Sequence, residues 1–203
     1  DSLFRSYDWD VASFTGKHAL EENFKSFDGQ NAPGILHVAS HGFFFNLYKG
    51  NKIEDRNLRN RLFLARNPLI RSGIALTGAN YSWKGGIVKD GFEDGILTAL
   101  EISNMDLSKT KLVVLSACET ARGDVFDGEG VFGLQRALKK AGAESLLLSL
   151  WKIPDEATVK LMKLFYLAYL TGKSPSNSLK KAQQQLRKEY PSPYYWASFK
   201  LIH

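Results

Sequence analysis

"LVVLSACET", residues 112–120, contains Cys118, the single cysteine of a 203-residue chain. Aliphatic and β-branched residues precede this cysteine and predict a buried strand over residues 111–118. The chain becomes polar directly afterwards, in "ETARGDVFDGEG", so we expect Cys118 at the end of the strand and not in its middle. Two interpretations of Cys118 compete: a small buried hydrophobic residue, or a nucleophile placed at the rim of a sheet.

Strand-like runs and helical periods alternate on both sides of this stretch. We predict helices over residues 17–27, 94–107, 130–143, 155–172 and 174–190, and strands over residues 34–42, 73–80, 144–151 and 194–202. Asp94 is the expected cap of the helix over residues 94–107. This order predicts an α/β fold in one domain, residues 1–203, with a mostly parallel central sheet, helices on both faces and the last strand at an edge.

The composition is that of an ordinary globular protein, with 44% hydrophobic and 24% charged residues. One cysteine permits neither an internal disulfide nor a four-cysteine zinc site, and no apolar run is long enough to span a bilayer. We therefore expect a cytoplasmic protein with no membrane partner. The positive residues behind the net charge of +6 are spread along the chain, and their densest cluster, residues 49–66, has no interleaved aromatic platform, so we expect no specific nucleic-acid partner.

His41 is the expected partner of Cys118. In parallel sheets, sites form beyond the carboxyl ends of strands, and His41 stands at the exit of the strand over residues 34–42. An imidazole can take the thiol proton and later protonate an amine leaving group, which is sufficient for acyl transfer. Gly42 would let a backbone N–H approach a substrate carbonyl. His37, four residues earlier on the same strand face, is expected to be a hydrogen-bonded strand residue.

From about residue 17 to its C-terminus, the chain resembles the CHAT domain, a branch of the caspase-like cysteine peptidases related to separase. The blocks that show the resemblance are, in chain order, "HVASHGFF", "NPLIRSGIALTGAN", "EDGILTALEISNMDL", "LVVLSACETARGD", "GEGVFGLQRALKKAGAESLLLSLWKIPDEAT", "LFYLAYL" and "WASFKL".

The resemblance implies a caspase-like three-layer α/β sandwich and a cysteine endopeptidase that cleaves peptide bonds in a protein substrate. It implies His41 and Cys118 as the catalytic dyad, the N–H groups of Gly42 and Cys118 as the oxyanion hole, and no metal or organic cofactor. CHAT domains usually follow helical repeats, often of the tetratricopeptide type, and this chain shows no such period. We therefore expect the C-terminal part of a longer protein, regulated by upstream repeats.

The substrate preference stays open at this stage. Separase-like relatives place an acid directly after the tryptophan and another in the next helix turn, where this chain has Lys152 and Val159. Asp155 and Glu156 remain candidates for the substrate pocket, although Asp155 is equally suited to cap a helix after Pro154. The arginine-rich residues 49–66 are a candidate site of self-cleavage.

Two other functions fit the same fold. A catalytically silent caspase-like module could serve as an interaction or scaffold domain, although such a module has no need of a thiol beside a histidine. A nucleotide-binding α/β protein ranks last, because no phosphate-binding glycine motif follows a predicted strand.

Overall fold

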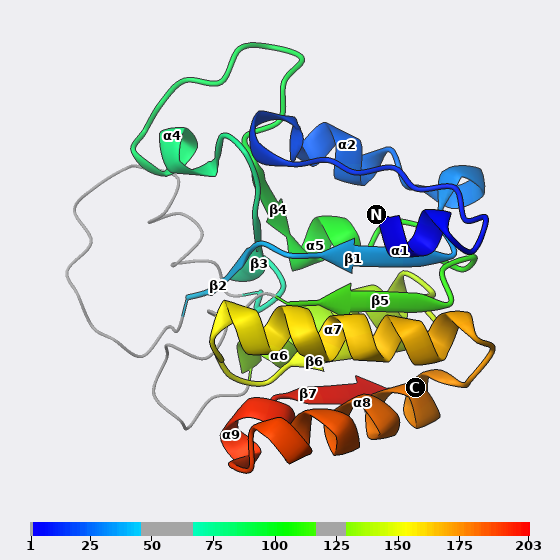
Figure 1. Ribbon diagram of the computed structural model, residues 1–203. Coiled ribbons are helices and arrows are strands. Elements are labelled where there is room, and N and C mark those ends of the chain that lie inside the picture. The colour runs from blue at the N-terminus through cyan, green and yellow to red at the C-terminus, as the bar shows by residue number, and fades with distance from the viewer. Residues whose placement is uncertain (1, 46–66, 117–128) are drawn as a thin grey trace.

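The computed structural model of the chain describes residues 2–45, 67–116 and 129–203, and of residues 129–132 it describes the backbone alone. Within these ranges the strands form two sheets (Figure 1). The larger has the order β1-β5-β6-β7, with β1 (Ile35–Val38), β5 (Leu112–Leu115) and β6 (Ser145–Ser149) parallel and β7 (Phe199–Ile202) antiparallel at an edge. The smaller is antiparallel, in the order β2 (His41–Phe44), β3 (Ser72–Ala75) and β4 (Ile96–Thr98).

The larger sheet is covered by helices on both faces. On one face lie α2 (Glu21–Lys25), α5 (Ala99–Ile102) and α6 (Glu129–Lys140), and on the other lie α1 (Ser2–Arg5), α7 (Asp155–Leu170) and α8 (Pro175–Glu189). Shorter elements complete the described chain: η1 (Gly16–His18), η2 (Gly29–Asn31), α4 (Ala79–Trp83) and α9 (Pro193–Trp196). This confirms the predicted mixed α/β class with a mostly parallel sheet between helix layers.

On both faces of the larger sheet, the side chains of β5 are buried. All of its residues are buried, and they alternate between the two layers: Leu112 and Val114 pack against α7, while Val113 and Leu115 pack beneath α6. Phe165 of α7 is completely buried in the first of these clusters. Burial of such a side chain stabilises the fold by about 1.5–3 kcal/mol.

The structure corrects several predicted boundaries. The strand predicted over residues 73–80 ends at Ala75, and α4 begins at Ala79. The helix predicted over residues 17–27 is η1 followed by the shorter α2. The strand predicted over residues 34–42 ends at Val38, and His41 begins a strand of the other sheet. The segment predicted as one helix over residues 94–107 is a strand followed by a short helix. Thr98, not Asp94, caps that helix, through a reciprocal pair of hydrogen bonds with Glu101. The last strand, predicted over residues 194–202, begins only at Phe199, and the residues before it belong to α9 and the short connection that follows it.

Among the described residues, no helix is both long and apolar enough to cross a membrane.

Candidate active site at the strand ends

β1 and β5 end side by side. Val38, the last residue of β1, lies opposite Leu115, the last residue of β5, and the amide of Ser116 donates to the Val38 carbonyl at 3.0 Å. The two strands therefore stay in register up to the residues at which they leave the sheet. His41 follows Val38 by three residues, and Cys118 follows Leu115 by three residues in the sequence. Cys118 itself lies outside the described residues.

His41 is exposed and stands at the start of β2, opposite Ala75 of β3. The preceding Ser40 donates from its hydroxyl to the Ala75 carbonyl at 2.5 Å. These contacts attach the histidine to the smaller sheet directly after the chain leaves β1. The earlier expectation that His37 and His41 share one strand face is wrong, because the chain changes sheets between them.

The smaller sheet is built by close packing around Phe43. Its ring is buried and contacts the Trp83 ring edge-on, with 5.7 Å between centroids. Gly73 lies against this ring: a Cβ at that position would meet the Leu97 carbonyl oxygen well inside contact distance and the Phe43 ring at 2.7 Å. Gly42, the expected oxyanion-hole residue, is buried in β2 beside Phe43. The strand that begins at His41 therefore rests on a tightly packed support.

Asp155 and Glu156 are exposed in the first turn of α7, shortly after the carboxyl end of β6. The helix cap is Pro154, without a side-chain hydrogen bond, so Asp155 is not the cap considered above. The segment before the helix is held by α9: the Trp151 indole donates to the Tyr194 carbonyl at 2.8 Å, and the Tyr194 hydroxyl donates to the Lys152 carbonyl at 2.6 Å. Both acids thus belong to the edge of the sheet where β1 and β5 end.

His37 faces away from this edge, toward α7. Its Nδ1 shares a hydrogen bond with the Tyr166 hydroxyl at 3.0 Å, as expected for a satisfied strand histidine. Although the residue retains exposed surface, desolvation of the ring against α7 lowers the pKa of its imidazole below the usual range. His37 is therefore a structural residue and a natural control for His41.

Comparison with known proteins agrees with this architecture. A family model described as "CHAT domain" matches residues 4–203. The chain belongs to the CHAT domain family. Its mostly parallel α/β sheet between helix layers is the caspase-like arrangement predicted from the sequence. The chain is also 38% identical over 109 residues to tetratricopeptide repeat protein 28 of Mus musculus and 36% identical over 109 residues to the Homo sapiens protein. These matches cover 53% of this chain and 4% of either relative.

A cluster of charges in this CHAT domain, which was not predicted from the sequence, joins α2 to α5 and to the loop before β4. The Lys25 ammonium lies 2.7 Å from a Glu21 carboxylate oxygen, 2.9 Å from one of Glu93 and 2.9 Å from one of Glu101. The three carboxylates approach within 4.8 Å of one another, a spacing that could hold a metal ion, but the ammonium already lies among them. The sequence does indicate one of these ion pairs, because Glu21 and Lys25 lie four residues apart on one predicted helix. Glu93 and Glu101 are distant in the sequence, and only folding brings them close to Lys25.

Burial and charge shift the pKa values within this cluster. Glu21 is 1% exposed, and its desolvation raises the pKa of the carboxyl to about 7 against the hydrogen bond and charge of Lys25. Desolvation also raises the pKa of the neighbouring Asp94 carboxyl. Burial opposes the charge of Lys25, but its hydrogen bonds with Glu21, Glu101 and Glu93 raise the pKa of the ammonium. Burial, with smaller contributions from the neighbouring acids Glu101 and Asp94, thus leaves Glu21 partly protonated near pH 7.

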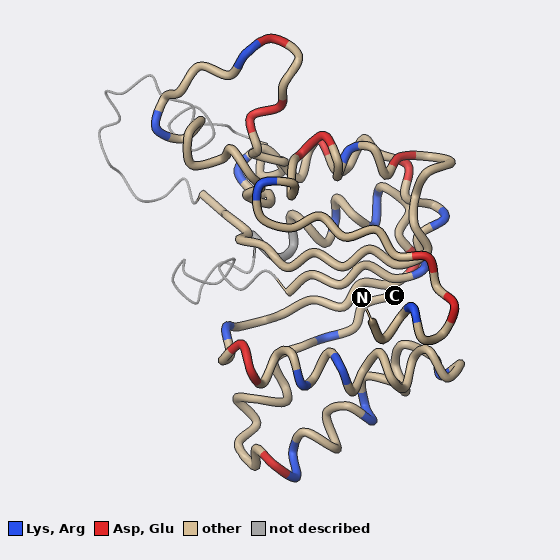
Figure 2. The backbone as a smooth tube through the Cα atoms, turned by 45° about the horizontal axis from the view of Figure 1, so that its top comes forward, with Lys and Arg blue, Asp and Glu red and all other residues tan. Residues whose placement is uncertain are grey.

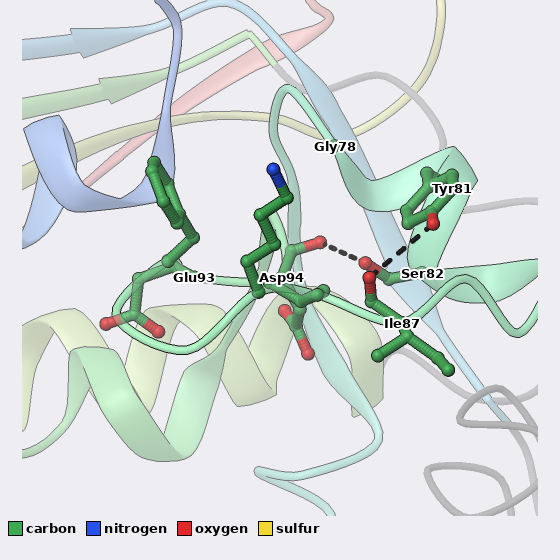
Figure 3. Close-up of a pocket in the computed structure, with 9 residues that line it drawn as sticks. Gly78, Tyr81, Ser82, Ile87, Glu93 and Asp94 are labelled. Carbon is green, nitrogen blue, oxygen red and sulfur yellow. Dashed lines mark hydrogen bonds between the residues drawn. The ribbon is translucent and has the colours of Figure 1, made fainter.

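The loop before β4, which carries Glu93 and Asp94, lines a pocket of about 360 Å³ beside α4 (Figure 3). Gly78, Tyr81 and Ser82 form one wall, and Ile87, Glu93 and Asp94 belong to the loop opposite. The Ser82 hydroxyl donates to the Asp94 carbonyl at 2.7 Å and holds the two walls together. The pocket and the charge cluster therefore share Glu93 and Asp94.

Proposed function

We propose that this CHAT domain is a cysteine endopeptidase with a His41–Cys118 dyad. The observation that supports the proposal best is the register of β1 and β5, because Val38 and Leu115 end their strands opposite each other. The two dyad residues follow these positions at the same sequence distance. Adjacent carboxyl ends of parallel strands are where α/β proteins build their sites.

The reaction would proceed through a covalent intermediate. His41 takes the thiol proton, and the Cys118 sulfur attacks the scissile carbonyl carbon to form a tetrahedral oxyanion, stabilised by the N–H groups of Gly42 and Cys118. The C–N bond then breaks as His41 protonates the departing amine. Water, deprotonated by His41, attacks the resulting thioester, and the acid product leaves as the thiol is restored. The dyad and backbone amides suffice for each step, without a metal or organic cofactor.

The substrate would be a protein or peptide in the cytoplasm. Asp155 and Glu156, exposed at the start of α7, are the proposed acids of the substrate pocket, where they would favour a basic side chain. The printed name of the matched relatives refers to tetratricopeptide repeats, so we also propose that such repeats precede this domain, residues 1–203, in a longer protein and regulate it.

A silent scaffold module is the second candidate. It is favoured by the names of the relatives, which refer to repeats and not to peptidase activity. In that case Cys118 would be a packing residue without an activated thiol.

Alkylation of the single cysteine separates the two candidates. We would measure the rate of iodoacetamide labelling between pH 5 and pH 9 for the parent, His41→Ala and the matched control His37→Ala. A dyad predicts fast labelling near neutral pH that is lost with His41→Ala and retained in the control. Equal, slow labelling of all three folded proteins would contradict the dyad and support the scaffold. A peptide library with Cys118→Ala as the inactive control then tests cleavage itself.

A further inference from the structure

The net charge of the chain is concentrated in one part of the fold. Residues 151–203 contain nine lysines and arginines and three acids. The net charge of this segment is therefore +6, the same as the formal net charge of the whole chain. The preceding residues are balanced in charge. The positive residues are spread along the chain, but acids offset them in total over residues 1–150 and not over residues 151–203, which form α7, α8, α9 and β7.

The excess charge lies on the outer side of the α7–α8 layer, and Figure 2 shows Lys and Arg positions recurring along these two helices. We call its exposed lysines the basic face: Lys163, Lys173, Lys180, Lys181 and Lys188. In the part of the chain that the structure describes, none of the five lies in an ion pair with a carboxylate. The fold therefore leaves this charge available to a partner.

Two exposed apolar side chains lie within the basic face. Val159 is 67% exposed and Leu167 is 36% exposed, and Lys163 stands midway between them on α7. Residues four apart lie on the same side of a helix, so the three form one stripe of about 12 Å. A single exposed valine is ordinary, but two large aliphatic residues flanking a lysine on one stripe give a protein partner something to pack against.

The stripe on α7 lies next to the lysines of α8. Lys160 of α7 forms an ion pair with Glu189, at the last residue of α8, and its ammonium lies 5.9 Å from the centre of the Tyr190 ring. Because α7 starts near the end of α8, the helices run antiparallel, and this pair shows that their exposed sides adjoin. Helices of 16 and 15 residues each extend about 23 Å, which is enough for a partner helix of similar length.

We propose that the basic face is a docking site for an acidic, amphipathic α-helix of another protein segment. Aspartates and glutamates of that helix would pair with Lys163, Lys181 and Lys188, while its aliphatic side chains would pack on Val159 and Leu167. A nucleic acid offers nothing apolar to these two residues at its phosphates, so the mixed stripe favours a protein helix. The site lies on α7 and α8 and does not depend on a working dyad at His41.

The test uses two fluorescent helical peptides of about 18 residues and equal composition. In the first, leucines at every fourth position form a stripe flanked by glutamates; in the second, the same residues are permuted so that no stripe forms. Fluorescence anisotropy measures their affinity for the parent and for two double variants, Lys163→Glu with Lys181→Glu and Val159→Ser with Leu167→Ser. The matched control, Lys84→Glu with Lys89→Glu, makes the same charge change at exposed lysines elsewhere.

We expect the parent to prefer the striped peptide, and each double variant on the basic face to bind it about tenfold more weakly or worse, with the control unchanged. Equal losses in the control would show unspecific charge attraction and overturn the proposal. Unchanged binding after Val159→Ser with Leu167→Ser would overturn it as well, as would tighter binding of a single-stranded RNA or of anionic lipid vesicles. Should the charge reversal lower the melting temperature, Lys163→Gln with Lys181→Gln replaces it.

Discussion

Replacing Glu21 by glutamine is expected to flatten the pH dependence of stability. The Glu21 carboxyl is buried, one oxygen accepts from Lys25 at 2.7 Å, and the other finds no donor. When this second oxygen holds a proton, it becomes a donor for the carboxylate of Asp94. Glutamine reproduces the neutral form, because its carbonyl can still accept from Lys25 while its amide donates.

The direction of this pH effect follows from the difference between the pKa of Glu21 in the folded and in the unfolded protein. The pKa of Glu21 rises from 4.5 to about 7 on folding, so its stabilising contribution is complete below pH 4.5 and is lost as the pH rises through 7. A shift of this size corresponds to roughly 3 kcal/mol. Lys25 and Glu93 are 27% and 40% exposed, so water reaches the cluster and weakens the desolvation that raises the pKa of Glu21, which reduces the expected effect to about 2 kcal/mol.

The assay is urea unfolding at pH 5 and pH 8. Relative to the parent, Glu21→Gln should gain about 2 kcal/mol between these two pH values, or roughly 4–8 °C in melting temperature. Glu144→Gln, an exposed acid on the same chain, is the matched control and should follow the parent. Parallel stability curves for the parent and Glu21→Gln would refute the buried proton.

Two further predictions concern the smaller sheet. Gly73→Ala should lower the free energy of unfolding, measured by denaturation, by about 2 kcal/mol or more, because the added Cβ would overlap the Leu97 carbonyl. Gly34→Ala is the control: its Cβ would lie in open space, so it should have little effect in the same experiment. Thr98→Ala should cost about 1 kcal/mol by removing the reciprocal cap with Glu101, and Thr98→Ser should restore most of it in thermal unfolding.

Local sequence was sufficient where an element is buried on both faces or closed by a distinct terminal residue. β5 is apolar at every position, and an uninterrupted aliphatic run of that length predicts such a strand. The helix over residues 130–143 was predicted and ends at Lys140, shortly before Gly142, whose φ of +100° is the left-handed conformation that favours glycine at a helix end. Thr98 and Glu101 also form a recognisable capping pattern, so the prediction that Asp94 caps this helix is wrong.

Local sequence was insufficient where pairing partners are far apart. Residues 34–42, "GILHVASHG", are bounded by glycines and rich in aliphatic residues, so they predict one strand. The break at Ser40 depends on Ala75, 35 residues later, whose carbonyl accepts from the Ser40 hydroxyl. The cluster around Lys25 is likewise assembled from α2, α5 and the loop before β4, and Glu101 lies 76 residues from the lysine. No pattern within one element predicts such a meeting.

The candidate site depends on two sheets, and different contacts fix the position of each. β1 and β5 are fixed in register by parallel pairing inside the core, so the positions of Val38 and Leu115 cannot shift without breaking the sheet. His41, in contrast, is set by the smaller sheet, because β2 pairs with β3 from its first residue. That sheet is tied in turn to α2 by Lys25, through Glu101 beside β4. A shift of the smaller sheet would therefore move His41 while the pairing of β1 with β5 stays unchanged.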